Sequence, residues 1–191
     1  MKKYSIKKIL IFNLIRNILE IIWVPKISNY VIIYLFKILV ADIVFKYLGR
    51  FSKLEISDFS NFGNKIIIGE NTSISDSNGG FVSILEDVKI ARNVTISADF
   101  GGKIHIGKGT LIGPNTVIRS SNHFIKKNKF IDNKYKSGDI YIGENCWIGA
   151  NCVILPGTKL SDNCTVGALS VTNKNYGNAS LVCGKIAETK K

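Results

Sequence analysis

Histidine and cysteine are scarce in this sequence, and the few that occur follow no metal-binding pattern. The 191 residues include two histidines and four cysteines, with no CxxC pair and no zinc-type spacing of cysteine and histidine. Two histidines are too few for a three-histidine metal site. Nor do the cysteines indicate a disulfide framework, and free thiols are typical of a reducing compartment. We therefore expect a cytoplasmic protein without a metal.

Glycine is almost absent from the first fifty residues, where Gly49 is the only one, whereas basic side chains are abundant there. Residues 1–53 carry ten basic and two acidic side chains, and the whole chain has a formal net charge of +12. The excess of positive charge therefore belongs mainly to this segment. Because the usual nucleic-acid-binding motifs are absent, we expect no nucleic-acid partner.

Long uncharged apolar runs are also absent from this basic segment. Residues 2–22 have apolar side chains at helical spacing, and Pro25 ends that pattern. Residues 30–48 are more apolar, but charged residues keep each run shorter than the roughly 20 residues of a spanning helix. We expect an amphipathic, hydrophobic and basic α-helical segment over residues 1–55. Three roles stay open: peripheral association of residues 1–50 with an anionic membrane surface, packing against the β-helix or another subunit, or a single tilted membrane span.

A period of six residues governs the segment 142–171. This period matches neither the 3.6 residues of a helix nor the two of a strand, and it is typical of a parallel β-helix built from stacked short strands. Small residues form a second column four places after each aliphatic one. The aliphatic column consists of Ile142, Ile148, Ile154, Leu160 and Val166.

The same repeat extends back to about Ile66, with two extra stretches of four residues near 78–80 and 101–102. Residues 124–139 lack the pattern and are predicted to form a loop extruded from one corner of the solenoid, a common place for function. The predicted fold class is therefore mainly β. We expect a β-helix domain over residues 56–185, followed by a basic tail at 186–191.

His123 is the candidate catalytic residue, because it stands where the repeat gives way to the extruded loop. A neutral imidazole, with an ordinary pKa of about 6.5, can serve as a base for a hydroxyl group. His105 precedes an inward-facing isoleucine, so the alternation of strand side chains places it on the surface. Asp99, in a glycine-rich corner, is a candidate for contact with acceptor hydroxyls.

Three segments carry a resemblance to a known family: GKIHIGKGTLIGPNTVIRSSNH, IYIGENCWIGANCVILPGT and ALSVTNKN. They resemble the hexapeptide-repeat acetyltransferases, which include galactoside, maltose and polysaccharide O-acetyltransferases. The resemblance covers residues 62–185 and is tightest over 142–156. It implies a left-handed coil, and a homotrimer whose active sites lie between subunits.

The resemblance also implies roles for individual residues. His123 matches the family's general base, and Asn122 is placed to orient it. Trp147 matches the tryptophan that lines the acetyl-CoA site, although plain core packing of this side chain stays open. The residues expected to contact acetyl-CoA are Trp147, Gly149, Ala150, Ala168 and Lys174.

The activity implied is direct transfer of acetyl from acetyl-CoA to a hydroxyl of a sugar or glycan, in a cell-surface polysaccharide or its precursor. A xenobiotic acetyltransferase of the same fold is an alternative, because Asn122, His123 and the sequence KSGD at 136–139 resemble elements of that group. A non-catalytic β-helix scaffold is a third alternative, although no regular array of threonines lies along one face.

Overall fold

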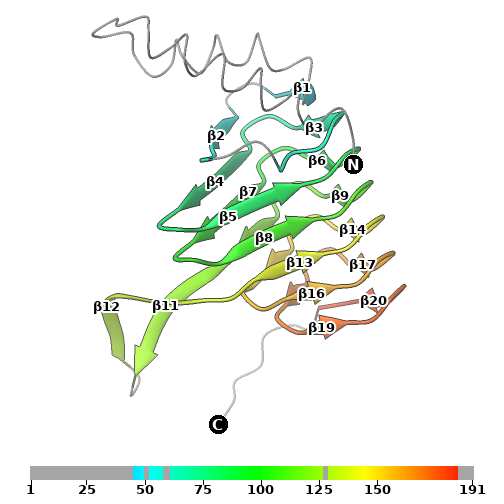
Figure 1. Cartoon of the computed structure of the whole chain (residues 1–191). Coiled ribbons are helices and arrows are strands. Elements are labelled where there is room, and N and C mark those ends of the chain that lie inside the picture. The colour runs from blue at the N-terminus through cyan, green and yellow to red at the C-terminus, as the bar shows by residue number, and fades with distance from the viewer. Residues whose placement is uncertain (1–44, 50–51, 58–60, 127–128, 185–191) are drawn as a thin grey trace, which may run out of the picture.

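The computed structural model describes residues 45–49, 52–57, 61–126 and 129–184, and these residues form a three-sided parallel β-solenoid (Figure 1). The predicted parallel β-helix is thereby confirmed. Most of the predicted helical segment and the tail at 186–191 lie outside the described residues. Within the described part, no helix has the length and apolarity needed to cross a membrane.

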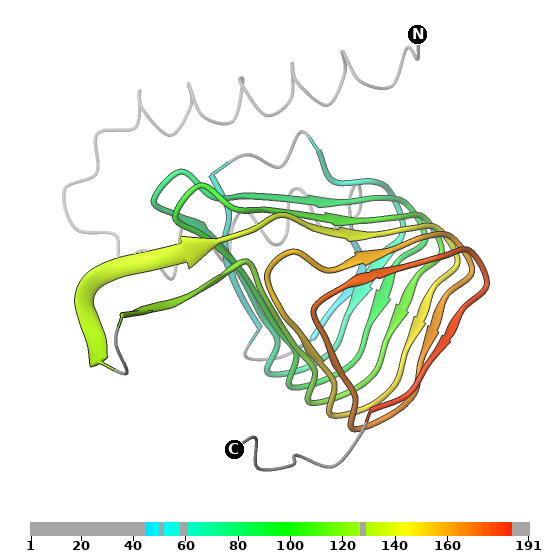
Figure 2. The same cartoon turned by 90° about the horizontal axis from the view of Figure 1, so that it is seen from below.

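Three parallel sheets form the sides of the solenoid, and each successive coil adds one strand to each sheet (Figure 2). In order, sheet 1 contains β1 (Phe45–Leu48), β3 (Ile66–Ile68), β6 (Lys89–Ile90), β9 (Leu111–Ile112), β14 (Trp147–Ile148), β17 (Thr165–Val166) and β20 (Leu181–Val182). Sheet 2 contains β2 (Lys53–Glu55), β4 (Ser73–Ser77), β7 (Thr95–Asp99), β10 (Val117–Arg119), β15 (Val153–Ile154) and β18 (Val171–Thr172). Sheet 3 contains β5 (Phe81–Ile84), β8 (Lys103–Ile106), β13 (Ile140–Ile142), β16 (Lys159–Leu160) and β19 (Asn175–Tyr176).

The aliphatic residue of each repeat points into the solenoid and is fully buried. Ile148, for example, pairs in register with Ile112 on one side and Val166 on the other, so like side chains stack from coil to coil. Burying a side chain of this size contributes roughly 1.5–3 kcal/mol to folding. The stacked columns therefore form one continuous core along the axis of the solenoid.

Asparagine residues form many of the corners. They adopt left-handed backbone conformations, with φ between 53° and 60°, which asparagine tolerates better than most residues. The Asn93 side chain also donates a hydrogen bond of 3.0 Å to that of Asn115 in the next coil. These corners include Asn71, Asn93, Asn115, Asn145, Asn151 and Asn163.

The small residues that follow the aliphatic column are buried, as expected for cysteines acting as small apolar groups. The thiols of Cys146, Cys152 and Cys164 each donate a hydrogen bond to a backbone carbonyl of the next coil, at 3.0–3.3 Å. Burial raises the pKa of the Cys146 and Cys152 thiols, so these two groups stay protonated near neutral pH.

The solenoid starts earlier than the predicted boundary at residue 56. Strands β1 and β2 fall inside the segment predicted to be helical, and they pair in parallel with β3 and β4. A short apolar run fits a buried strand as well as a helix by pattern alone, so only the pairing with the next coil decides. For residues 45–48 and 53–55, the helical prediction is wrong.

The excursion expected at residues 124–139 is a two-stranded hairpin, with a shift of register between His123 and Ile125. Strands β11 (Ser121–Lys126) and β12 (Lys129–Ser137) pair antiparallel, and the hairpin begins three residues earlier than predicted. It projects away from the body of the solenoid (Figure 2). We call β11 and β12 together the hairpin.

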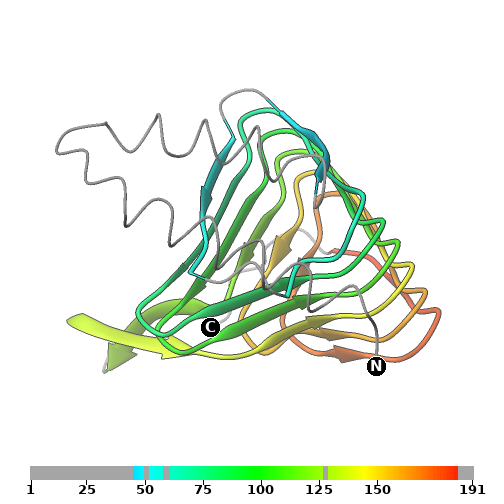
Figure 3. The ribbon, with the colours of Figure 1, turned by 45° about the horizontal axis from the view of Figure 1, so that its top comes forward.

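All the long connections lie at one corner of the triangle, between sheets 2 and 3 (Figure 3). The extra residues predicted near 78–80 and 101–102 join β4 to β5 and β7 to β8, and the hairpin joins β10 to β13. We call this edge, comprising 78–80, 100–102 and the hairpin, the long corner. The other two corners keep the short hexapeptide turn, so variation in chain length is confined to one edge.

Candidate functional site

His123 lies on β11, close to the root of the hairpin, and its side chain is exposed. The strand pairing places it directly opposite Tyr135 of β12. The two rings have centroids 5.0 Å apart and are inclined at 37°. An exposed imidazole on a rigid strand can exchange a proton with a bound hydroxyl group, as the predicted role requires.

Tyr135 also ties the hairpin to the preceding coil. Its ring stacks on that of Phe100, with centroids 3.6 Å apart and planes inclined at 10°. Phe100 lies in the connection between β7 and β8 and has a φ of 53°, an unusual value for a bulky residue. The backbone at Phe100 is therefore strained. In this conformation the Phe100 ring stacks on Tyr135, the residue opposite His123.

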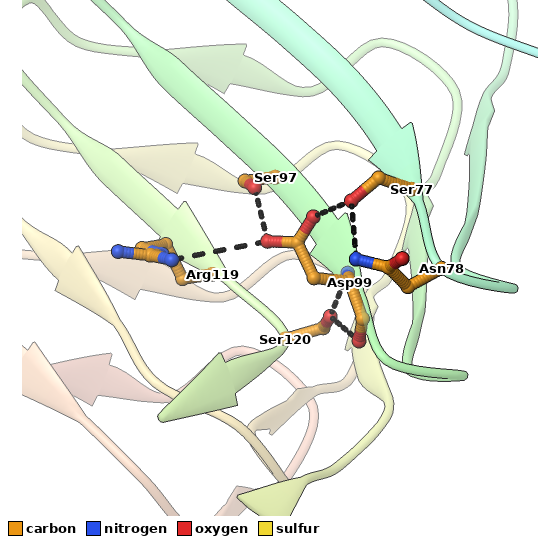
Figure 4. Close-up of polar contacts among 6 residues, drawn as sticks. All are labelled: Ser77, Asn78, Ser97, Asp99, Arg119 and Ser120. Carbon is orange, nitrogen blue, oxygen red and sulfur yellow. Dashed lines mark hydrogen bonds and ion pairs between the residues drawn. The ribbon is translucent and has the colours of Figure 1, made fainter. Parts of the chain in front are cut away.

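Asp99 lies at the same corner, but its carboxylate is only 8% exposed and is held by protein groups (Figure 4). Its two oxygens accept hydrogen bonds from the hydroxyls of Ser77 at 2.6 Å and Ser97 at 2.5 Å. The Arg119 guanidinium lies 3.8 Å from the carboxylate. Contact of Asp99 with an acceptor hydroxyl stays a prediction, and in this structure such a contact would compete with both serines.

Backbone contacts fix the coil just before the hairpin. The amide of Asp99 donates to Ser120 Oγ at 2.8 Å, and this hydroxyl donates back to the Asp99 carbonyl at 3.3 Å. The neighbouring Ser121 is 2% exposed, and its hydroxyl has no hydrogen-bond partner among the described residues. The chain therefore enters the hairpin from a tightly packed position.

Asn122 was expected to orient His123, and the structure gives it a different neighbour. Asn122 pairs across the hairpin with Lys136, whereas His123 pairs with Tyr135. Because successive side chains of a strand point to opposite faces, Asn122 and His123 lie on different faces of the hairpin. Tyr135, rather than Asn122, is therefore the neighbour of His123 on its face of the hairpin, and Tyr135 stacks on Phe100. The sequence alone does not single out this aromatic pair.

Trp147 points outward from sheet 1 and is 57% exposed, so the alternative of core packing is wrong. The corner that follows it is tight: a Cβ at Gly149 would lie 2.6 Å from the backbone nitrogen of Ala168 in the next coil. Ala150 and Ala168 are small residues at this corner between sheets 1 and 2. Gly149 is buried against the next coil, so the open indole ring of Trp147 is the feature here that fits the expected binding of a ligand.

The predicted site residues form two groups rather than one pocket. Trp147, Gly149, Ala150 and Ala168 lie at or beside the corner between sheets 1 and 2. The other group lies at the long corner between sheets 2 and 3. Its member Lys174 is exposed and lies two coils beyond the hairpin. Within a single chain, sheet 2 separates the groups. The residues of the second group are Asp99, Asn122, His123 and Lys174.

His105 is half-buried on the outer surface of sheet 3, in agreement with its predicted outward orientation. Its ring stacks on Tyr141, with centroids 4.9 Å apart and planes inclined at 12°. Burial lowers the pKa of His105, and the charge of Glu144 acts in the opposite direction. Among the described residues, no group of three potential metal ligands is found.

Comparison with known proteins agrees with this architecture. Residues 139–174 match the bacterial transferase hexapeptide family, which is described as six repeats. A mutant of AntD, an N-acyltransferase from Bacillus cereus in complex with dTDP-4-amino-4,6-dideoxyglucose and coenzyme A, is 17% identical with a TM-score of 0.53. The match covers 74% of this chain and 78% of AntD. At this identity the similarity concerns the fold.

Two further solved structures are similar to this chain. A hexapeptide-repeat acetyltransferase from Vibrio cholerae O1 biovar eltor, complexed with acetyl coenzyme A, is 25% identical, with a TM-score of 0.48 and coverage of 83% of this chain and 74% of that protein. The polysialic acid O-acetyltransferase OatWY is 19% identical, with a TM-score of 0.44 and coverage of 73% and 84%. Residues 139–174 therefore carry the bacterial transferase hexapeptide repeat, which agrees with the predicted resemblance to the hexapeptide-repeat acetyltransferases.

Proposed function

We propose that the protein transfers acetyl from acetyl-CoA to a hydroxyl of a sugar, in a cell-surface polysaccharide or its precursor. The observation that carries the proposal is His123: an exposed imidazole on the hairpin, held at the long corner through Tyr135 and Phe100. This arrangement gives a hexapeptide-repeat transferase a fixed base beside open surface.

In the proposed reaction, His123 takes the proton of the acceptor hydroxyl while the hydroxyl oxygen forms a bond to the acetyl carbonyl carbon. The carbon–sulfur bond of the thioester then breaks, and the departing thiolate receives the proton from the imidazolium. The products are the acetyl ester and free coenzyme A. His123 thus acts first as a base and then as an acid, and no further reactant is needed.

Trp147, Gly149, Ala150, Ala168 and Lys174 are the residues proposed to hold acetyl-CoA. The proposal is supported by the exposed Trp147 ring and by the exposed Ala168 and Lys174. AntD, which shares the fold, was solved with coenzyme A. The acetyl-CoA site in this chain is a proposal that binding measurements can test.

We further propose a left-handed coil and a homotrimer in which each active site combines two subunits. The support is that the two groups of site residues lie on different corners of one solenoid. If subunits pack side by side, the Trp147 group of one subunit can face the hairpin of the next. Residues 1–50 are proposed to hold the enzyme at the cytoplasmic membrane surface, close to a glycan precursor.

The test is release of free thiol from acetyl-CoA by the full chain, with a panel of acceptors that includes sugars, glycans and hydroxyl-bearing antibiotics. We expect a glycan to stimulate release, and His123→Ala to abolish most of that stimulation while still binding coenzyme A. His105→Ala is the matched control, because it removes the other histidine of the chain. Wild-type rates for His123→Ala would overturn the assignment of the base. Stimulation by antibiotics alone would favour the xenobiotic alternative.

A further inference from the structure

The hairpin that carries His123 is strongly basic. All four of its described lysines are exposed, and no described residue forms an ion pair with them. The acidic side chain of the hairpin, Asp132, bonds to its own neighbour Asn133 at 3.0 and 3.2 Å. The lysines are Lys126, Lys129, Lys134 and Lys136.

Two of these lysines face each other at the far end of the hairpin. Lys126 and Lys129 are a directly opposed pair across the two strands. Like charges in this position repel each other and destabilise the hairpin. The chain therefore concentrates positive charge at a site where folding alone gains nothing from it, which points to an anionic ligand.

The remaining lysines extend this charge to the root of the hairpin. Lys136 is opposite Asn122, on the face away from His123, and Lys134 precedes Tyr135. Asn122 and Lys126, the partners of Lys136 and Lys129, are four residues apart on β11, or about 13 Å at roughly 3.3 Å per residue. Positive charge therefore extends from the root of the hairpin to its far end, and a single sugar would meet only part of it.

Two aromatic side chains of the hairpin are partly open as well. Phe124 is 38% exposed and Tyr135 is 36% exposed. Their apolar surface lies among cationic groups, so the hairpin offers both apolar contact and charge to a ligand lying along it. Hexoses combine apolar ring faces with polar edges, and acidic sugars add a carboxylate.

We propose that the hairpin binds an acidic polysaccharide as an extended chain, with negatively charged sugars along the lysines from Lys136 towards Lys126 and Lys129. This inference rests on the proposed acetyl transfer and narrows its acceptor to an anionic polymer. The lysines contribute mainly long-range attraction, so binding weakens as salt rises.

The test measures equilibrium binding of fluorescent hyaluronan, a carboxylated polysaccharide, to the full chain without acetyl-CoA. Dextran of similar length is the neutral comparison, and a hyaluronan disaccharide is the short one. The variant is Lys126→Gln/Lys129→Gln, far from the base. Its matched control is Lys89→Gln/Lys159→Gln, which removes the same charge from exposed positions on sheets 1 and 3. Because no acetyl transfer is measured, the result is independent of the proposed chemistry.

We expect salt-sensitive binding of hyaluronan and little binding of dextran or the disaccharide. The hairpin variant should bind hyaluronan about three- to tenfold more weakly, as loss of two exposed charge contacts implies, whereas the control variant should match wild type. Equal binding of dextran, or an unchanged affinity in the hairpin variant, would overturn the proposal. A third arm uses phosphatidylglycerol vesicles: if the hairpin variant loses vesicle binding but keeps hyaluronan binding, the lysines serve a membrane surface and the proposal fails.

Discussion

The ring of Tyr135 lies against Phe100 on one side of the long corner and within 5.0 Å of His123 across the hairpin. One aromatic side chain thus connects the proposed base to the preceding coil of the solenoid. This contact adds to the connection that the two ends of the hairpin make with the body. We expect the stack of Phe100 on Tyr135 to help position His123.

Phe100→Ala should lower kcat for acetyl transfer by up to about tenfold, because an aromatic pair contributes about 0.5–1.5 kcal/mol beyond its buried area. Coenzyme A binding should be unchanged, since Phe100 lies away from the Trp147 corner. Steady-state thiol release with a stimulating glycan measures kcat and KM separately. Tyr135→Phe keeps the ring and should retain kcat. Loss of activity in both variants would assign the tyrosine hydroxyl a role that we do not expect.

Asp99→Ala should lower the free energy of unfolding by about 1–3 kcal/mol, because two serine hydroxyls and Arg119 lose their anionic partner. Asp132→Ala removes an exposed carboxylate and should change stability by less than about 0.5 kcal/mol. Urea unfolding followed by circular dichroism compares the two variants. Equal stability of wild type and Asp99→Ala would show that the buried carboxylate is not needed for folding.

Gly149→Ala should destabilise the solenoid by about 3 kcal/mol, since the added Cβ meets backbone atoms of Ala168 that cannot move independently of their coil. Gly177→Ala is the matched control. Its Cβ would meet only Ser180 Oγ at 3.9 Å, so the change should be neutral or slightly stabilising. Thermal unfolding of both variants tests this, and similar melting temperatures would contradict the close packing at Gly149.

Stability should fall as the solution becomes acidic, in part because of His105. Burial holds the pKa of this group below its ordinary value of 6.5, so the unfolded chain binds a proton there more readily than the folded chain. The contribution of neutral His105 is complete above about pH 6.5 and is lost as pH falls towards the lowered pKa of the folded state. Urea unfolding between pH 5 and 8 should show a weaker pH dependence for His105→Asn.

The period of six residues predicted the solenoid because each side of every coil repeats the same backbone geometry, with one inward-facing aliphatic residue. Alternation around inward-facing Ile148 is enough to place Trp147 on the outside. The same reasoning predicted extra residues near 78–80 and 101–102. It did not predict that these connections and the hairpin lie at the same corner. The corner at which an insertion lies depends on the number of residues in each side of the triangle.

The hairpin shows where pattern reasoning fails. Residues 124–139 have no repeat, so the sequence identifies an excursion but does not determine which residues of its two strands are opposite each other. That pairing decides that Tyr135 faces His123 and that Lys126 faces Lys129. The contact between Phe100 and Tyr135 joins residues 35 positions apart and leaves no local signal. The early strand β1 was missed because a short, mostly apolar run is compatible with both a helix and a strand, and β2, with the sequence KLE, has no pattern of its own.

Every insertion lies at the long corner. The length of the exposed connections can therefore change without a change in the packing of the interior. The two short corners and the isoleucine columns keep adjacent coils in register, whatever the length of the segment between β10 and β13. A hairpin of different length or composition could therefore be exchanged at Ser121 and Ser137 without altering the interior. Evolution, or a designer, can replace the hairpin while the rest of the solenoid is inherited unchanged.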